Sequence, residues 1–276
     1  MTRPTTQTTS GDVLRLFNTT PAADMEYESW TSNPRYRDRV VPHVLSHRTE
    51  VIYRLTPRDI DEVCRDTSRI RGGHALGDIR KSEGTRIPEV NDWNPPFAFS
   101  HVFHHVVESL GRVPTWIEFV LFINRDPIGR AMLGDEQARL IDELAPHRGG
   151  RDAVESAIQW RLGNAYYSFL RELHVLANLR ATGVDACTHP LADALFRVDA
   201  WYGSTVLVLY IGNDEYRNGA AGRKKQAQRI LGGALRPFAF ESVNLPTSHE
   251  FGKVHLPSLS AIEAVAERML SSTVSS

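Results

Sequence analysis

The chain contains 276 residues, of which 41% are hydrophobic and 24% are charged, and these fractions are typical of a folded globular protein. Its 32 lysine and arginine residues nearly balance its 33 acidic residues, which gives a net charge of −1. This balance excludes a protein that is basic over its whole surface, so any nucleic-acid-binding site must be a local patch. The two cysteines, Cys64 and Cys187, are far apart and show no metal-ligand spacing, which argues against a disulfide framework and a structural zinc site.

Both ends of the chain are predicted to lack regular structure. Residues 1–11 are rich in threonine and have no apolar core like that of a signal peptide, so they are expected to form a disordered lead-in. Residues 271–276 are expected to form a similar tail. No stretch approaches the roughly 18 consecutive apolar residues of a membrane span, so no membrane partner is expected and the cytoplasm is the expected compartment.

Residues 12–150 are predicted to form a mostly helical N-terminal region. Residues 51–55 are mostly apolar and favour a short strand. Thr56 then provides a helix N-cap, with Pro57 at the first helical position and Asp59 near the positive end of the helix dipole. A further helix is predicted over residues 135–144.

Two helices over residues 97–110 and 115–124, joined by a turn with Gly111 and Pro114, could form a DNA-binding helix-turn-helix. The second helix is too apolar to lie in a DNA groove, which favours a buried helical hairpin instead. Its apolar side chains are Trp116, Phe119, Val120, Phe122 and Ile123.

Three histidines fall on the first of these helices: His101, His104 and His105. His101 and His105 share one face and could hold a metal, but the glutamate of an HEXXH motif is absent, which favours a packed surface. The pair Gly149-Gly150 is the predicted domain boundary.

Residues 151–270 are predicted to form a mixed α/β domain, with a central mixed sheet flanked by helices. Apolar residues recur every three to four positions from Val154 to Ala177, which predicts one long helix that ends at Thr182-Gly183. The elements predicted after it are strands at 184–188, 195–201, 205–211 and 238–245 and helices at 222–231 and 259–270.

The predicted strand at residues 205–211, TVLVLYI, shows no polar alternation, so we expect it at the centre of the sheet. Asp199 lies on the preceding strand, where an unpaired carboxylate would be costly. It therefore needs a partner, which could be a metal ion, Arg180 or Arg197, or backbone amides.

The order helix–strand–strand–strand–helix–strand, with an acid in the second strand, resembles the αβββαβ catalytic core of the PD-(D/E)XK nuclease superfamily. The resemblance covers residues 157–245. It implies hydrolysis of phosphodiester bonds, with one or two Mg²⁺ or Mn²⁺ ions held by acids and a lysine that positions or activates the attacking water. Such nucleases cut DNA more often than RNA, serve in DNA defence and mobile elements, and many act as homodimers or with a partner protein.

The resemblance assigns Asp199 as the strand aspartate and Glu172 as the helix glutamate. The expected acid–x–lysine element departs from the family pattern, because Ile211-Gly212-Asn213 stands at the usual distance. Glu215, or Asp214, is the alternative second acid, and Lys224 could supply the lysine from the following helix.

Hairpin geometry weakens the assignment of Glu215, because Asp199 should lie opposite residues 207–209, which places Glu215 about six residues farther along. The segment from Arg217 to Arg236 has six basic residues and no acidic one, and a helix N-terminus within it could bind phosphate. An exposed basic helix face is the competing interpretation. The predicted nucleic-acid-binding residues are Arg217, Arg223, Lys224, Lys225 and Arg229.

Three hypotheses therefore remain open from the sequence. In the first, the chain is a metal-dependent nuclease with a rearranged site: Asp199 with Glu215 or Asp214 binds the metal, Glu172 assists, and Lys224 contacts the phosphate. In the second, a nuclease-like fold without the chemistry acts as a DNA-binding or assembly subunit. In the third, the α/β domain is unrelated to nucleic acid and Asp199 forms a structural ion pair.

Overall fold

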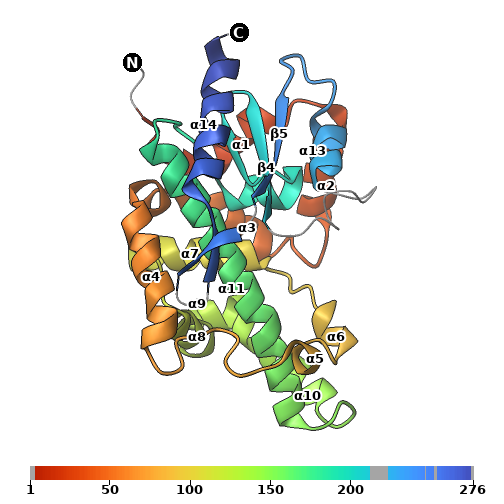
Figure 1. Cartoon of the computed structure of the whole chain (residues 1–276). Coiled ribbons are helices and arrows are strands. Elements are labelled where there is room, and N and C mark those ends of the chain that lie inside the picture. Colours follow the sequence, from red (N-terminus) through yellow and green to blue (C-terminus); the bar gives the residue numbers. More distant parts are fainter. Residues whose placement is uncertain (1–3, 212–222, 246, 252–253, 275–276) are drawn as a thin grey trace. The chain divides into compact units, whose positions relative to one another are not determined.

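A computed structural model describes residues 4–211, 223–245, 247–251 and 254–274 (Figure 1). The chain is mixed α/β, with far more helix than strand. It forms two compact units. We call them the sheet unit, which comprises Met1–Ile60, Arg171–Glu250 and His255–Ser276, and the helical unit, which comprises Asp61–Leu170 and Phe251–Val254.

The units differ from the predicted division at Gly149-Gly150. This glycine pair immediately precedes α11 (Arg151–Ala181), and the two glycines have positive φ angles of 88° and 93°. The long helix is confirmed, but its residues are shared between the two units. A glycine turn therefore marks the start of a helix here.

Three strands form the central sheet of the sheet unit, in the order β3-β4-β5. β3 (Ala200–Tyr202) and β4 (Thr205–Ile211) form an antiparallel hairpin, and β5 (Ala239–Leu245) pairs with β4 in parallel. The predicted central position of β4 is confirmed, because it has a neighbour on each side and its residues 206–208 are fully buried.

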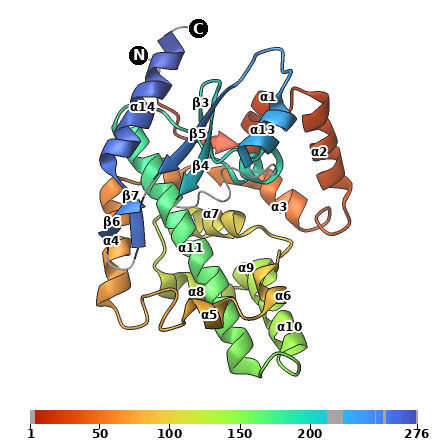
Figure 2. The same cartoon turned by 45° about the vertical axis from the view of Figure 1, so that its right-hand side comes forward.

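The parallel pairing of β4 with β5 requires a crossover connection, and α13 (Arg223–Leu231) lies on it. Figure 2 shows the sheet between two layers of helices. The C-terminal part of α11 and α14 (Leu259–Val274) lie on one side. On the other side lie α13 and the N-terminal helices, which are α1 (Ser10–Phe17), α2 (Pro21–Ser32) and α3 (Val40–Ser46).

Phe17 is the centre of the aromatic core of the sheet unit. Its ring is fully buried and lies 5.6 Å from Phe196, 5.3 Å from Trp201 and 5.4 Å from Phe238, measured between ring centroids. Such ring pairs stabilise beyond the area that they bury. The N-terminal helix is thus part of the core that supports the sheet.

The predicted disorder of both chain ends is wrong within the described residues. β1 (Thr8–Thr9) pairs with β2 (Arg48–Thr49), and α14 continues to Val274. The lead-in is ordered by polar contacts, including a capping box in which Thr9 and Asp12 each bond to the other's backbone N–H. Hydrophobicity patterns do not report such contacts.

Several predicted strands also differ from the structure. Residues Val51–Arg54 form a 3₁₀ turn instead of a strand, and residues 184–188 contribute only a single bridge between Cys187 and Trp201. Residues Ala192–Phe196 form a π-helical turn, followed by Arg197 with a φ of 61°, so the predicted strand 195–201 begins only at Ala200. Apolar runs of this length do not distinguish a buried turn from a buried strand.

Arg180 joins the end of α11 to the N-terminal segment. Its guanidinium forms an ion pair with Asp185 (2.8 Å), donates to the carbonyl oxygens of Thr5 and Ala186 (2.8 Å each), and lies 4.5 Å from the ring centroid of Tyr53. These contacts are largely shielded from water, which strengthens them.

Replacing Arg180 by methionine is expected to lower the free energy of unfolding by about 2 kcal/mol, because Asp185 and two carbonyl groups lose a donor. Urea denaturation at pH 7.5 measures the effect. Arg229→Met is the matched control, since its exposed guanidinium lies 3.8 Å from Glu26 and should contribute less than about 0.5 kcal/mol. Equal effects of the two substitutions would contradict this role of Arg180.

The helical unit confirms most of the predicted helices. Its core is a stack of aromatic rings in which Phe103 lies 4.4 Å from Phe119 and 5.1 Å from Phe169, and the buried Tyr166 hydroxyl donates to the Pro114 carbonyl (2.8 Å). The helices of this part of the chain are α4 (Pro57–Arg69), α5 (Lys81–Gly84), α6 (Pro88–Asn91), α7 (Phe99–Leu110), α8 (Trp116–Arg125), α9 (Pro127–Gly129), α10 (Asp135–Leu144) and the first part of α11.

The structure supports the buried hairpin rather than the helix-turn-helix. In α8, Trp116, Phe119 and Ile123 are buried, and on α7 His101 and His104 are buried beside aromatic rings. No helix among the described residues is long and apolar enough to cross a membrane.

Glu118 fixes the start of α8. Its carboxylate accepts from the backbone N–H of Thr115 (2.9 Å) and from Arg112, and these bonds lower its pKa to about 2. A depressed pKa stabilises the fold above pH 4.5, and this contribution is lost as the pH falls toward 2.

Glu118→Ala is therefore expected to lower the free energy of unfolding at pH 7 by about 1 kcal/mol, because the capping box is lost and the ion pair is partly exposed. Thermal unfolding at pH 7 and pH 2 measures both the effect and its loss in acid. Glu143→Ala, which removes an exposed ion pair with Arg139, serves as the control. A Glu118 effect that persists unchanged at pH 2 would contradict this account.

Candidate functional site

Asp199 occupies the residue before β3, where its backbone is held from two sides. Its N–H donates to the carbonyl of Leu207 (3.2 Å), and its own carbonyl accepts from the Thr188 hydroxyl (2.9 Å). The acid therefore has a fixed position at the edge of the hairpin, although it precedes the strand in which the sequence analysis placed it.

The Asp199 carboxylate points along the central strand. Its Oδ2 accepts from the backbone N–H of Leu209 (2.8 Å), and Ala200 pairs with Leu207, so the predicted register of Asp199 opposite residues 207–209 is confirmed. Backbone amides were one of the partners predicted for this acid. A backbone donor leaves no trace in the sequence, so the particular amide could not have been identified from it.

Glu172 reaches the same place from α11. Burial raises the pKa of Asp199 well above its ordinary value, and the nearby Glu172 carboxylate raises it further, while the Leu209 N–H lowers it in part. Two carboxyl groups that disfavour each other's ionisation are typical of functional sites, although ion-pair networks in other proteins also shift pKa values. The structure thus brings together two of the four predicted catalytic residues.

These two acids fit the first ligands of a divalent cation. Mg²⁺ is usually held by one or two carboxylates, with water and substrate phosphates completing its coordination. Among the described residues, no group of three or more His, Cys, Asp or Glu side chains is placed to hold a metal. The predicted further ligands Glu215 and Asp214 lie outside the described residues.

The two arginines that were candidate partners of Asp199 lie differently. Arg180 binds Asp185. Arg197 has a left-handed backbone conformation two residues before Asp199, where it ends the π-helical turn.

The basic helix predicted over residues 222–231 exists as α13, which the structure describes from Arg223 to Leu231. Arg217 and the side chains of Arg223, Lys224 and Lys225 lie outside what the structure describes. Arg229 on the same helix is exposed, with Glu26 of α2 at 3.8 Å. Of the five residues predicted to bind nucleic acid, the structure therefore locates the side chain of one, and that side chain faces solvent.

Comparison of the chain with models of protein families, with curated proteins and with solved structures found no match.

Proposed function

We propose that this protein is a metal-dependent phosphodiesterase that cleaves DNA, of the PD-(D/E)XK type, with Asp199 and Glu172 as its first metal ligands. The observation that carries the proposal is the close pair of carboxyl groups beside the central strand, in which the Asp199 group is desolvated and Glu172 disfavours its charge. Without a cation such a pair is costly, because each negative charge opposes the other.

The order of elements supports the same proposal. Along the chain, α11 is followed by an isolated bridge at Cys187 and then by β3, β4, α13 and β5. This order agrees with that of the superfamily except that a single bridge stands where the family has its first strand. Asp199 immediately precedes β3, and Glu172 stands on α11.

In the proposed reaction, Asp199 and Glu172 would be ionised and would hold the cation with their carboxylate oxygens. A bound Mg²⁺ or Mn²⁺ would polarise the scissile phosphate and lower the pKa of the attacking water. Lys224 contacts the phosphate, and Glu215 or Asp214 is the further acid. Water adds to phosphorus and loses a proton to the solvent, the bond to the leaving sugar oxygen breaks, and that oxygen takes up a proton from the solvent.

One observation favours a second candidate function. The residues of β4 that lie beside Asp199 are Leu207, Val208 and Leu209, so this part of the strand lacks the acid and lysine that the family places there. A chain of this kind could instead bind DNA, or assemble with a nuclease partner, through its basic helix.

Incubation of the full chain with supercoiled plasmid DNA in Mg²⁺, Mn²⁺ or EDTA tests the two functions. Cleavage that needs the cation, and that is lost in Glu172→Gln but kept in Asp24→Asn, supports the nuclease. Salt-sensitive DNA binding without cleavage, weakened by Lys224→Ala and Lys225→Ala together, supports the second function. Absence of both binding and cleavage at low salt rejects both functions, and an RNA substrate of the same length tests the preference for DNA.

A further inference from the structure

A cavity of about 360 Å³ lies within the helical unit, between α8, α10 and the first turns of α11. Cavities that bind small organic molecules start at about 300 Å³, so this one is large enough for a compact ligand. Its walls are apolar and polar in about equal parts. The apolar wall residues include Trp116, Ile123, Ile141, Ile158 and Leu162.

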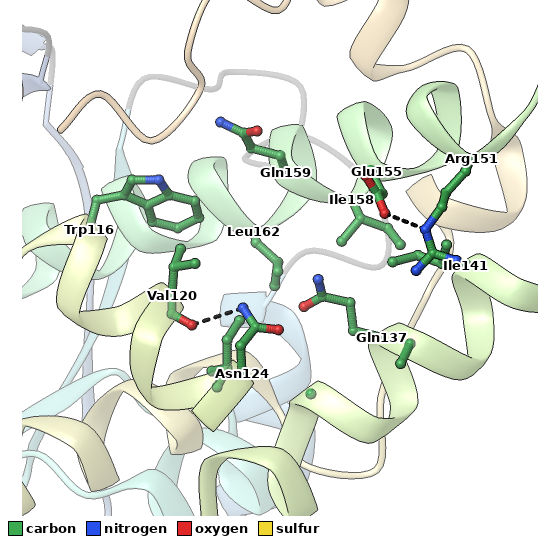
Figure 3. A pocket seen from close by; sticks show the side chains of 13 residues that line it. Trp116, Val120, Asn124, Gln137, Ile141, Arg151, Glu155, Ile158, Gln159 and Leu162 are labelled. Carbon is green, nitrogen blue, oxygen red and sulfur yellow. Dashed lines mark hydrogen bonds and ion pairs between the residues drawn. The ribbon is translucent and has the colours of Figure 1, made fainter. Parts of the chain in front are cut away.

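Two side-chain amides belong to the polar part of these walls. The Oε1 of Gln137 is buried and, within the described part of the chain, has no hydrogen-bond partner. Asn124 donates its NH₂ group to the Val120 carbonyl (2.8 Å), which leaves its amide oxygen as an acceptor. Figure 3 shows the two amides turned toward one another from α10 and α8. A buried acceptor without a donor costs about 1–3 kcal/mol, and a ligand with an N–H group would remove this cost.

The charges of the two ionised residues in the cavity lining, Arg151 and Glu155, sum to zero. Arg151 forms ion pairs with Glu155 (2.8 Å) and Asp142 (3.0 Å), and Figure 3 shows the Arg151–Glu155 pair at one end of the cavity. The guanidinium is therefore already neutralised, so the lining offers no counter-charge to an anion. An ammonium group would lose its hydration without gaining a free carboxylate.

We propose that this cavity binds an uncharged, flat organic molecule whose N–H group donates to the Oε1 of Gln137. The site requires neither a metal nor DNA, so it is independent of the function proposed above. Its ligand class is set by three features of the lining: a set of apolar side chains, two facing amide acceptors and a net charge of zero.

Titration with 2-naphthamide, followed by ligand-observed NMR, tests this site. Three probes of similar shape serve as controls: methyl 2-naphthoate, which has no N–H donor, the 2-naphthoate anion, and the 2-naphthylmethylammonium cation. We expect 2-naphthamide to bind at least about tenfold more tightly than any of the three, because only it satisfies Gln137 without bringing a charge.

Two variants separate the proposed contact from non-specific binding. Gln137→Leu should weaken binding of 2-naphthamide about tenfold while leaving methyl 2-naphthoate unchanged or tighter. Ala138→Phe, at an exposed position of the lining, should fill the cavity and abolish binding of both without lowering the melting temperature. Equal affinity for the amide and the ester, tighter binding of either ion, or full binding in both variants would overturn the proposal.

Discussion

Asp199→Asn is expected to abolish cation-dependent DNA cleavage and, at the same time, to raise the free energy of unfolding of the metal-free protein at pH 8 by about 1–3 kcal/mol. Asparagine keeps the shape of the side chain and its acceptor for the Leu209 N–H (2.8 Å). It removes the charge that burial and Glu172 disfavour. A residue that is retained for structure would show the opposite change in stability.

The sign of this effect follows from the raised pKa of Asp199. Between pH 3.8, the ordinary value, and the higher pKa of the folded state, the folded protein binds more protons than the unfolded chain. Stability therefore falls as the pH rises through this window. Asp199→Asn should remove this slope.

Thermal unfolding in EDTA and in 10-fold steps of MnCl₂ measures both parts of the prediction. The wild type should gain stability with Mn²⁺ and the variant should not, because binding to the folded state alone shifts unfolding by mass action. Asp24→Asn, on the sheet unit's second helix, is the control and should respond like the wild type. A destabilised variant that still responds to Mn²⁺ would show that Asp199 is a structural acid.

Sequence patterns correctly predicted the helix and the strand that bury an unbroken row of apolar side chains. α11 was identified correctly because a long stripe of apolar residues predicts an amphipathic helix. β4 was identified correctly because an uninterrupted apolar run predicts a strand that is buried on both faces. The hairpin followed from Gly203, whose φ of 56° suits a tight turn. These two elements and the turn determine where Asp199 lies.

The errors occur where polar contacts or non-standard turns decide the structure. The prediction of a strand at 195–201 was wrong for its first part, because the π-helical turn Ala192–Phe196 buries the same residue types as a strand. The prediction of a disordered lead-in was wrong because Thr5 donates two hydrogen bonds, of 2.7 and 2.8 Å, to the carboxylate of Asp185, which is far away in the sequence. No periodicity reports a contact of this kind.

The candidate site, too, has parts that the sequence predicted and parts that it did not. Glu172 and Asp199 were predicted as partners from the resemblance and lie together in the structure. The amide of Leu209 and the cavity beside Gln137 were not predicted, because a backbone donor and an empty volume carry no residue signature.

His189 is expected to make the fold sensitive to mild acid. The side chain is completely buried, its Nδ1 accepts from the Leu191 N–H (3.0 Å), and its Nε2 lies 3.3 Å from the His47 carbonyl oxygen. The accepting Nδ1 must be unprotonated, which assigns the proton to Nε2 and makes the ring neutral. Burial lowers the pKa of His189 to about 4.

A lowered histidine pKa means that the unfolded chain binds the extra proton first. As the pH falls from 6.5 to about 4, the wild type should therefore lose about 3 kcal/mol of stability through this residue alone. His189→Gln keeps a donor and an acceptor but cannot be protonated, so it should be less stable than the wild type at pH 7.5 and should not share this loss.

The decisive quantity is the difference in free energy of unfolding between the wild type and His189→Gln, measured by urea denaturation from pH 7.5 to pH 4.5. Other groups titrate in this range, and the Asp199 carboxyl acts in the opposite direction, but their contributions cancel in the difference. His255→Gln, at an exposed position, should follow the wild type throughout. We expect the advantage of the wild type to shrink steadily as the pH falls, and a difference that stays constant would mean that His189 is not held neutral in the core.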